Sequence, residues 1–148
     1  MFGIQWDLAC KFLEAKGGLT TIDINSNSTS WGNYNNAKIE NIASGKYAIY
    51  NESTLGAWIT ISGSYTKQDS GNDYRTLLST GIADYTQKMN IYDFAGNEWE
   101  WTLAHATIEA PNSDRGGSYR NNSEDCPVSH FSHYNKGCIE IGFRVTFY

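Results

Sequence analysis

The chain has 148 residues, of which 40% are hydrophobic and 18% are charged, and its formal net charge is −5. This length and hydrophobic content predict one domain, spanning residues 1–148, that can bury a core of its own. A negative charge without any basic run argues against binding to a nucleic-acid backbone, and no apolar stretch is long enough to be inserted across a membrane.

The first predicted element is a helix over Ile4 to Ala15. Its apolar residues recur at helical spacing, at Trp6, Ala9, Cys10 and Leu13. Lys16 provides a basic last turn and the two glycines that follow it provide a stop. We expect this to be the one clear helix of the chain.

Short strands are predicted further along the chain, where β-branched and aromatic residues cluster. These stretches are Tyr47 to Tyr50, Ala57 to Ile61 and Gly142 to Phe147. Asn25 to Asn36 and Gly63 to Asn72 are rich in Ser, Asn and Gly and are predicted as loops. The pattern predicts an α+β fold that is loop-rich, with short antiparallel strands.

The stretch Asn90 to Thr102 is too densely aromatic for a solvated loop, so its aromatic residues are expected mostly in the core. They are Tyr92, Phe94, Trp99 and Trp101. Gly96 fits a turn that needs positive φ. Asn97 and Glu100 bring two oxygen-bearing side chains to the same turn, and oxygen ligands suit calcium.

Three phrases occur in a fixed order: Asn90 to Thr102, then Arg115-Gly116-Gly117-Ser118-Tyr119, then Ile141 to Val145. This order resembles the formylglycine-generating-enzyme/sulfatase-modifying family, which reads G-(L/I)-Y-D-M-x-G-N-V-W-E-W-T, R-G-G-S-(W/Y) and G-F-R. Gln5 to Ala9 and Trp31 to Asn33 look like two upstream phrases of the family. The resemblance implies a C-type-lectin-like fold. It also implies that the family's N-terminal strand is missing and that the chain is the later part of a longer protein.

The resemblance assigns scaffold roles to several residues. Arg115 and Arg144 are expected to satisfy buried carboxylates or carbonyls. The core is expected to be fixed by Tyr92, Trp99, Trp101, Gly116, Gly117 and Phe143. In family members the stretch equivalent to Asn97 and Glu100 lies at a calcium site. These two residues are therefore candidate calcium ligands, and the alternative is that Glu100 binds buried backbone amides.

The family's oxidases hold copper(I) between two cysteines after the R-G-G-S phrase. In register, Asn121 stands at the first position and Cys126 at the second. One thiolate does not make that linear site, so we do not expect an enzyme. A zinc site is a further alternative, because two thiols and two imidazoles lie in one segment. They are Cys126, His130, His133 and Cys138.

The segment Ser118 to Glu140 also resembles the variable region of proteins diversified by retroelements in phages and bacteria. Such a region follows R-G-G-S-W, is rich in small polar and aromatic residues, and ends near I-G-F-R. Substitution of the template adenines of Asn codons yields a restricted residue set that excludes Gln, Glu, Lys, Met and Trp. Between Ser118 and Ile139, Glu124 and Lys136 are the members of that excluded set.

This second resemblance implies a non-catalytic receptor-binding or display module on a virion or bacterial cell surface, with a protein or cell-surface ligand. Rigid aromatic anchors and small polar groups are typical of such contact surfaces. The residues expected to contact the ligand are Tyr119, Arg120, Asn122, Glu124, Asp125, His130, Phe131, His133, Tyr134 and Asn135. The alternatives left open are a copper oxidase and a metal-stabilised structural domain.

Overall fold

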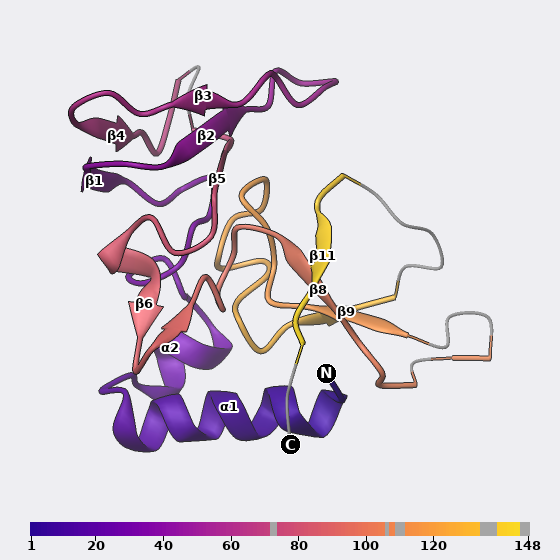
Figure 1. Cartoon of the computed structure of the whole chain (residues 1–148). Coiled ribbons are helices and arrows are strands. Elements are labelled where there is room, and N and C mark those ends of the chain that lie inside the picture. The colour runs from indigo at the N-terminus through magenta and orange to yellow at the C-terminus, as the bar shows by residue number, and fades with distance from the viewer. Residues whose placement is uncertain (72–73, 106, 109–111, 134–138, 146–148) are drawn as a thin grey trace.

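The computed structural model describes residues 1–71, 74–105, 107–108, 112–133 and 139–145. Within them, two helices come first and short strands follow in four small sheets (Figure 1). The elements are α1 Gly3–Lys16, α2 Thr21–Asn25, β1 Ile39–Ile42, β2 Lys46–Ile49, β3 Ile59–Thr60, β4 Tyr65–Lys67, β5 Thr76–Leu78, the 3₁₀ turn η1 Asp84–Thr86, β6 Gln87–Lys88, β7 Ile91–Tyr92, β8 Trp99–Thr102, β9 Ser113–Arg115, β10 Phe131–Ser132 and β11 Ile141–Phe143. The fold is therefore mixed α+β with one main helix, as the sequence predicts. No helix in the described ranges has the length and apolar character that crossing a membrane requires.

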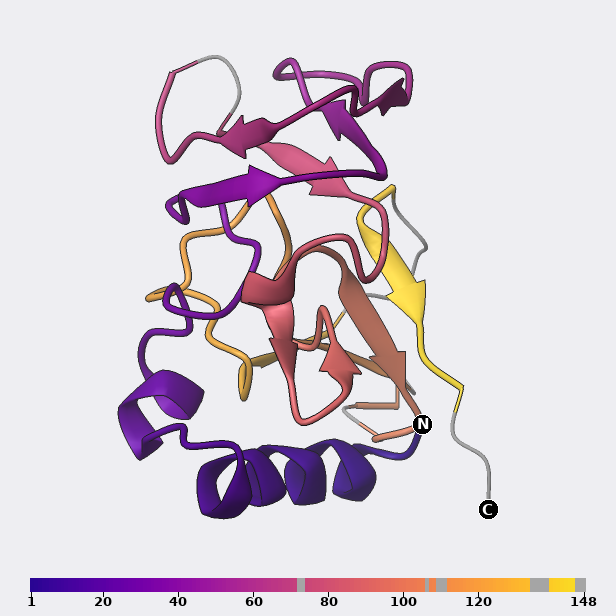
Figure 2. The ribbon, with the colours of Figure 1, turned by 60° about the vertical axis from the view of Figure 1, so that its left-hand side comes forward.

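Helix α1 lies along the base of the molecule (Figure 2), and it confirms the helix predicted over Ile4 to Ala15. Its buried side is led by Trp6, which is 0% exposed. The Trp6 ring stacks on Phe94 with 4.0 Å between centroids, and its Nε1 donates to the Val128 carbonyl at 3.0 Å. The helix is thus joined both to the aromatic phrase and to the chain after Ser118.

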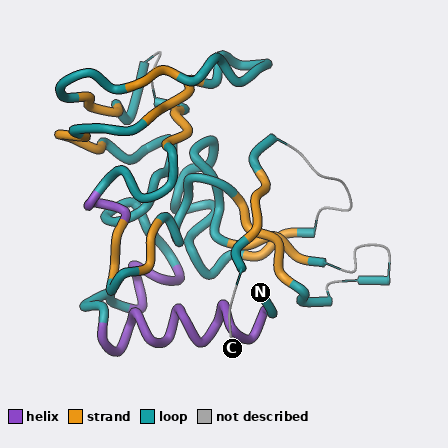
Figure 3. The backbone as a smooth tube through the Cα atoms, viewed as in Figure 1, coloured by secondary structure: helices purple, strands orange, loops and turns teal. Residues whose placement is uncertain are grey.

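The largest sheet has the strand order β10-β9-β8-β11. β10, β9 and β8 run antiparallel, whereas β11 is parallel to β8, with Ile141 opposite Trp99. The expectation of antiparallel strands throughout is wrong here, because the chain crosses from β10 at one edge of the sheet to β11 at the other. Figure 3 shows these strands gathered at one side of the molecule.

A second sheet of order β3-β2-β5 lies above, with the two-stranded ribbon β1-β4 beside it, and the ribbon β6-β7 lies lower, between this sheet and α1 (Figure 1). The strand predicted at Tyr47 to Tyr50 is confirmed as β2, and the one at Ala57 to Ile61 is reduced to β3. β4 lies inside the stretch Gly63 to Asn72 that was predicted as a loop.

The aromatic core differs in part from the expectation. Phe94 and Trp99 are buried as predicted, at 1% and 8% exposed. Trp101 is half-buried, and Tyr92 and Phe143 are exposed by 37% and 78%. The prediction of a core position is wrong for these three residues. Trp101 and Phe143 lie on the same side of the sheet as Trp99, but the ring of His130 packs against Trp99, whereas Trp101 and Phe143 lie opposite each other further along the sheet.

The turn predicted at Gly96 is confirmed, and Gly117 has a similar backbone conformation. Gly96 has φ +69°, and a Cβ there would lie 2.4 Å from the Asn33 carbonyl oxygen. Gly117 has φ +73°, and a Cβ there would lie 2.6 Å from the Cys126 carbonyl oxygen and 2.8 Å from the Tyr34 ring. A side chain at either position would combine backbone strain with a clash.

One lysine is enclosed within the upper part of the fold. Lys67 on β4 is 0% exposed, and its Nζ donates to the carbonyls of Tyr34 and Ala37 at 2.6 Å each and to that of Gln68 at 3.2 Å. Burial lowers its pKa to about 7, and the nearby Asp69 acts in the opposite direction. The lysine therefore joins β4 to the loop that follows Trp31.

Candidate functional site

The register of the four-stranded sheet divides its side chains between two faces. Residues directly opposite each other project to the same side, so Trp101 shares a face with Asp114 and Ser132 joins that face through Asp114. We call this the pocket face, and its members are Trp99, Trp101, Asp114, Ser132, Ile141 and Phe143. The opposite side carries Glu100, Arg115 and Phe131; Arg115 there reaches Asp7 of α1 at 3.4 Å. We call it the helix face.

A pocket of about 240 Å³ opens on the pocket face. We call it the sheet pocket, and it is lined by Arg75, Trp99, Asp114, Arg120, Asn121, Ser132, Glu140 and Ile141. Half of this lining comes from the segment 118–140, and the rest comes from β8, β9, β11 and the chain just before β5. Sheet residues therefore form one side of the pocket and the candidate variable segment contributes the other.

An ion pair fixes one wall of the sheet pocket. Arg120 Nη1 donates to Glu140 Oε1 at 2.5 Å, and Ser118 Oγ donates to Glu140 Oε2 at 2.9 Å. The Arg120 guanidinium also lies over the Tyr50 ring, 4.1 Å from its centroid. Both partners are partly shielded from solvent, so this wall is held in one arrangement.

Asn121 and Cys126 are the two positions compared with the copper cysteines, and they do not provide a thiolate pair. The Asn121 side-chain oxygen accepts from Ser118 N at 3.0 Å and from Ser118 Oγ at 2.8 Å. Burial raises the pKa of the Cys126 thiol to about 11, so at neutral pH this group is protonated and weakly nucleophilic. The geometry gives no support to the oxidase alternative.

Tyr119 was expected on the ligand-contacting surface, and that placement is wrong. Its side chain is 0% exposed and packs with Leu77 and against the edge of the Tyr50 ring, 6.4 Å between centroids. After Gly117 the chain turns inward, and Tyr119 N donates to the Asn97 carbonyl at 3.0 Å. Tyr119 therefore belongs to the core, and the binding surface begins at Arg120.

The loop after Arg120 carries three of the expected contact residues at the surface: Asn122, Glu124 and Asp125. Glu124 is held by two amides, because its carboxylate accepts from Asn27 Nδ2 at 2.8 Å and Asn36 Nδ2 at 2.7 Å. Glu124 thus fastens the segment to the loop before β1, and the other two residues stay available to a ligand.

The expected contact residues near β10 are split between the two faces. His130 is half-buried against Trp99, 5.8 Å between ring centroids. Phe131 and His133 are exposed, with rings 5.5 Å apart, and the Arg115 guanidinium lies 5.2 Å from the Phe131 ring centroid on the helix face. The structure therefore does not bring these two residues into the sheet pocket. Tyr134 and Asn135 lie outside the described residues.

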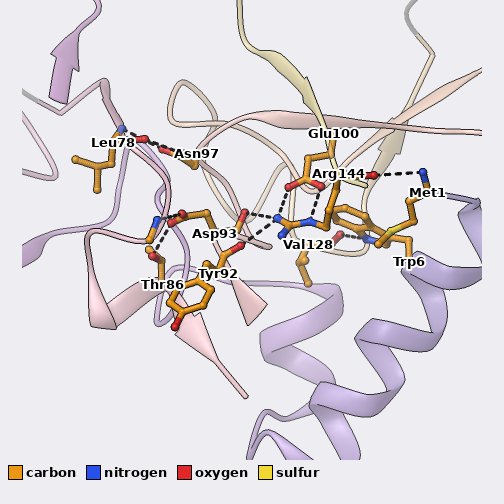
Figure 4. A network of polar contacts seen from close by, with 11 residues as sticks. Met1, Trp6, Leu78, Thr86, Tyr92, Asp93, Asn97, Glu100, Val128 and Arg144 are labelled. Carbon is orange, nitrogen blue, oxygen red and sulfur yellow. Dashed lines mark hydrogen bonds and ion pairs between the residues drawn. The ribbon is translucent and has the colours of Figure 1, made fainter. Parts of the chain in front are cut away.

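The two candidate calcium ligands do not converge on a shared cation position. Asn97 Oδ1 accepts from Asn33 Nδ2 at 2.8 Å and from Leu78 N at 3.1 Å. Both Glu100 oxygens accept from Arg144, with Nε to Oε2 at 2.8 Å (Figure 4). All three side-chain oxygens are occupied by protein donors, so these residues do not form a calcium site as arranged here. The alternative expectation, that Glu100 binds buried backbone amides, is also wrong, because the Glu100 carboxylate binds Arg144.

The described residues do not support the zinc alternative either. There, no three His, Cys, Asp or Glu side chains lie close enough together to hold a metal ion. Cys126, His130 and His133 therefore do not form a ligand set with one another. Cys138 lies outside the described residues.

Arg144 is the centre of a polar network that supports the sheet (Figure 4). Besides Glu100, its Nη2 contacts the carbonyls of Tyr92 at 3.0 Å and Asp93 at 3.4 Å. Burial raises the pKa of Glu100, and the hydrogen bonds from Arg144 oppose that shift. The network fastens β11 to the aromatic phrase, which confirms the scaffold role expected for this arginine.

Of the eight residues that line the sheet pocket, Arg120 was expected to contact the ligand and the other seven were missed. Asp114 stands directly before the R-G-G-S phrase, and Ser132 alternates with Phe131, so both could have been found from strand alternation. Arg75 carries no local signal, because it comes to the pocket only through the pairing of β5 with β2.

The chain matches no protein-family model, and neither curated proteins nor solved structures contain a match. The assignment of a function therefore depends on the sheet pocket and on the motif phrases.

Proposed function

We propose that the chain is a non-catalytic ligand-binding module with a C-type-lectin-like fold of the formylglycine-generating-enzyme subtype. It presents the sheet pocket and the adjoining loop to a protein or cell-surface ligand, on a virion or bacterial cell surface. One observation carries the proposal. Four residues of the segment 118–140 line a pocket, namely Arg120, Asn121, Ser132 and Glu140, and the flanking phrases form the support beneath them.

The flanking phrases and the segment 118–140 differ in how far their side chains are bound within the fold. In the flanking phrases, Asn97, Glu100 and Arg144 are all bound internally, so a change there disrupts buried contacts. Asn122 and Asp125 are exposed and make one long hydrogen bond to each other at 3.4 Å. Exposed positions of this kind tolerate substitution, which is what a diversified surface requires.

The test of diversification is to sequence the codons of residues 90–145 from many isolates of the source population. We expect differences to gather at Asn codons such as those of Asn121 and Asn122, with the phrases before Ser118 and after Glu140 constant. A reverse-transcriptase gene nearby, with a near copy of the Ser118 to Arg144 coding segment, would support the same conclusion. A segment that is constant in all isolates, or differences spread evenly over the phrases, would overturn the proposal.

A further inference from the structure

Arg75 differs from the other arginines of the described chain in having no carboxylate partner there. The three others are each ion-paired, as Arg115 with Asp7, Arg120 with Glu140 and Arg144 with Glu100. Among the described residues, Arg75 has no ion pair, and its Nε is buried without a hydrogen-bond partner. A guanidinium with unused donors, partly removed from water, favours an acidic group.

The position of Arg75 is fixed without the use of those donors. Its carbonyl accepts from Tyr50 N at 2.9 Å, and its guanidinium lies 4.8 Å from the Tyr74 ring centroid. Tyr50 also supports Arg120 through its ring. Arg75 is therefore held at the wall of the sheet pocket by backbone and ring contacts.

We propose that the sheet pocket binds a carboxylate group through Arg75, and this proposal rests on the ligand-binding function proposed above. The planar fork of a guanidinium matches a carboxylate in two parallel hydrogen bonds. Asn121 and Ser132 line the pocket beside it, and Trp99 and Ile141 give it apolar walls.

The neighbouring charges favour a single negative charge over a dianion. Asp114 and Glu140 also line the pocket, so a phosphate dianion would meet repulsion that a carboxylate meets less strongly. The pocket volume of about 240 Å³ lies below the range of roughly 300–1,000 Å³ that is typical of sites for drug-sized ligands. One acidic side chain or one acidic sugar unit is the ligand size that fits.

The experiment is an NMR titration that follows the Nε–Hε signals of the four arginines in the ¹⁵N-labelled chain. The probes are N-acetyl-aspartate amide and glucuronate, and the neutral controls are N-acetyl-asparagine amide and glucose. We expect at least one carboxylate probe to shift the Arg75 signal and to saturate with a Kd on the order of 1 mM, as a single small anchor allows. Each neutral control should bind at least about tenfold more weakly, which corresponds to the loss of one charge-assisted contact.

Two variants of Arg75 and a charge-matched control separate the effect of the Arg75 guanidinium from that of positive charge in general. Arg75→Gln should abolish saturable binding, and Arg75→Lys, which keeps the charge without the fork, should weaken it several-fold. Lys46→Gln, which removes one positive charge from an exposed position on β2, should bind as the unaltered chain does. If Arg75→Gln fails to fold, Arg75→Lys gives the same decision.

The pattern of responses identifies the source of the carboxylate. A response to the aspartate probe alone indicates an acidic side chain of a protein ligand, and a response to glucuronate alone indicates an acidic sugar. Equal responses to charged and neutral probes, no response to either carboxylate, or undiminished binding by an Arg75 variant that folds would overturn the carboxylate proposal. None of these outcomes bears on codon variability, so failure of this inference is distinguishable from failure of the display proposal.

Discussion

Arg120 Nη1 and Glu140 Oε1 are 2.5 Å apart, and this ion pair joins the beginning of the segment 118–140 to its end. The Arg120 side chain is 31% exposed and that of Glu140 is 17% exposed. Ser118 and the Tyr50 ring hold the pair from either side. A segment fastened at both ends in this way can change between those ends without losing its position on the sheet.

The strength of this ion pair can be measured by a double-mutant cycle with Arg120→Ala and Glu140→Ala. Partial shielding and the second donor from Ser118 give an expected coupling of about 1 kcal/mol in the free energy of unfolding. The same cycle on Lys11 and Glu14, an i,i+3 pair with its lysine 73% exposed, should give a clearly smaller coupling, because solvent screens an exposed pair. If the two couplings were equal, the pair would not be the fastening described here.

Tyr119 and Phe131 are two aromatic residues of the same segment with opposite surroundings, 0% and 53% exposed. Tyr119→Ala should cost about 3–5 kcal/mol of stability, because it opens a cavity beside Tyr50 and Leu77. Phe131→Ala should cost about 1 kcal/mol or less. Urea unfolding of the two variants measures both values, and similar losses would contradict the assignment of core and surface.

The Tyr119 hydroxyl provides a finer test of that assignment. It is buried without a hydrogen-bond partner among the described residues, and burial raises its pKa to about 12. Tyr119→Phe removes this unpaired group while it keeps the ring, so stability should stay equal or rise slightly. A loss above about 1 kcal/mol would show that the hydroxyl is satisfied in solution.

The sequence was sufficient where one local signal decides the structure. The helix α1, the strand β2 and the positive φ of Gly96 each follow from spacing, composition or the absence of a side chain. The sequence was not sufficient for the side to which a short strand turns each residue. Phe143 was expected in the core and is exposed, because an aromatic residue on an edge strand has the same local pattern on either face.

The candidate site was predicted in part for the same reason. The position of the segment 118–140 between the scaffold phrases drew attention to residues that supply half of the sheet-pocket lining, and Arg120 was among its expected contact residues. Tyr119 was misplaced, because its side chain lies in the core. Phe131 is exposed as expected but lies on the helix face beside Arg115, since one residue of register decides the face of a strand. Arg75 stands just before β5 and far from the segment 118–140 in the sequence, so its place in the pocket depends on tertiary pairing that spacing does not encode.

Gly117 should tolerate alanine much less well than Gly18, although both have φ +73°. A Cβ at Gly18 meets nothing within 4 Å, so Gly18→Ala should cost about 1–2 kcal/mol from backbone strain alone. A Cβ at Gly117 would lie 2.6 Å from the Cys126 carbonyl oxygen, which adds about 1–3 kcal/mol of overpacking. Thermal unfolding of both variants isolates the clash. Equal losses of stability in the two variants would mean that the loop around Cys126 moves to make room for the Cβ without destabilising the fold.

Lys67 should make stability rise with pH above neutrality. Its pKa is about 7 in the fold and 10.5 ordinarily, so in between the unfolded chain binds a proton that the folded chain does not. Stability therefore increases as pH rises through this window, by up to about 1.4 kcal/mol per pH unit. Below pH 7 both states carry the proton, and the contribution becomes constant.

The measurement is urea unfolding from pH 6 to 8.5, for the unaltered chain and for Lys67→Met. The pH limit matters because burial raises the pKa of Cys10 to about 12 and that of Cys126 to about 11. These thiols ionise first in the unfolded chain, and so they lower stability at higher pH. Lys67→Met keeps both cysteines and leaves three carbonyls without their donor, so it should be less stable at every pH but with a flatter profile above pH 7. If both proteins gained stability equally between pH 7 and 8.5, Lys67 would retain its proton in the fold, held by those three carbonyls.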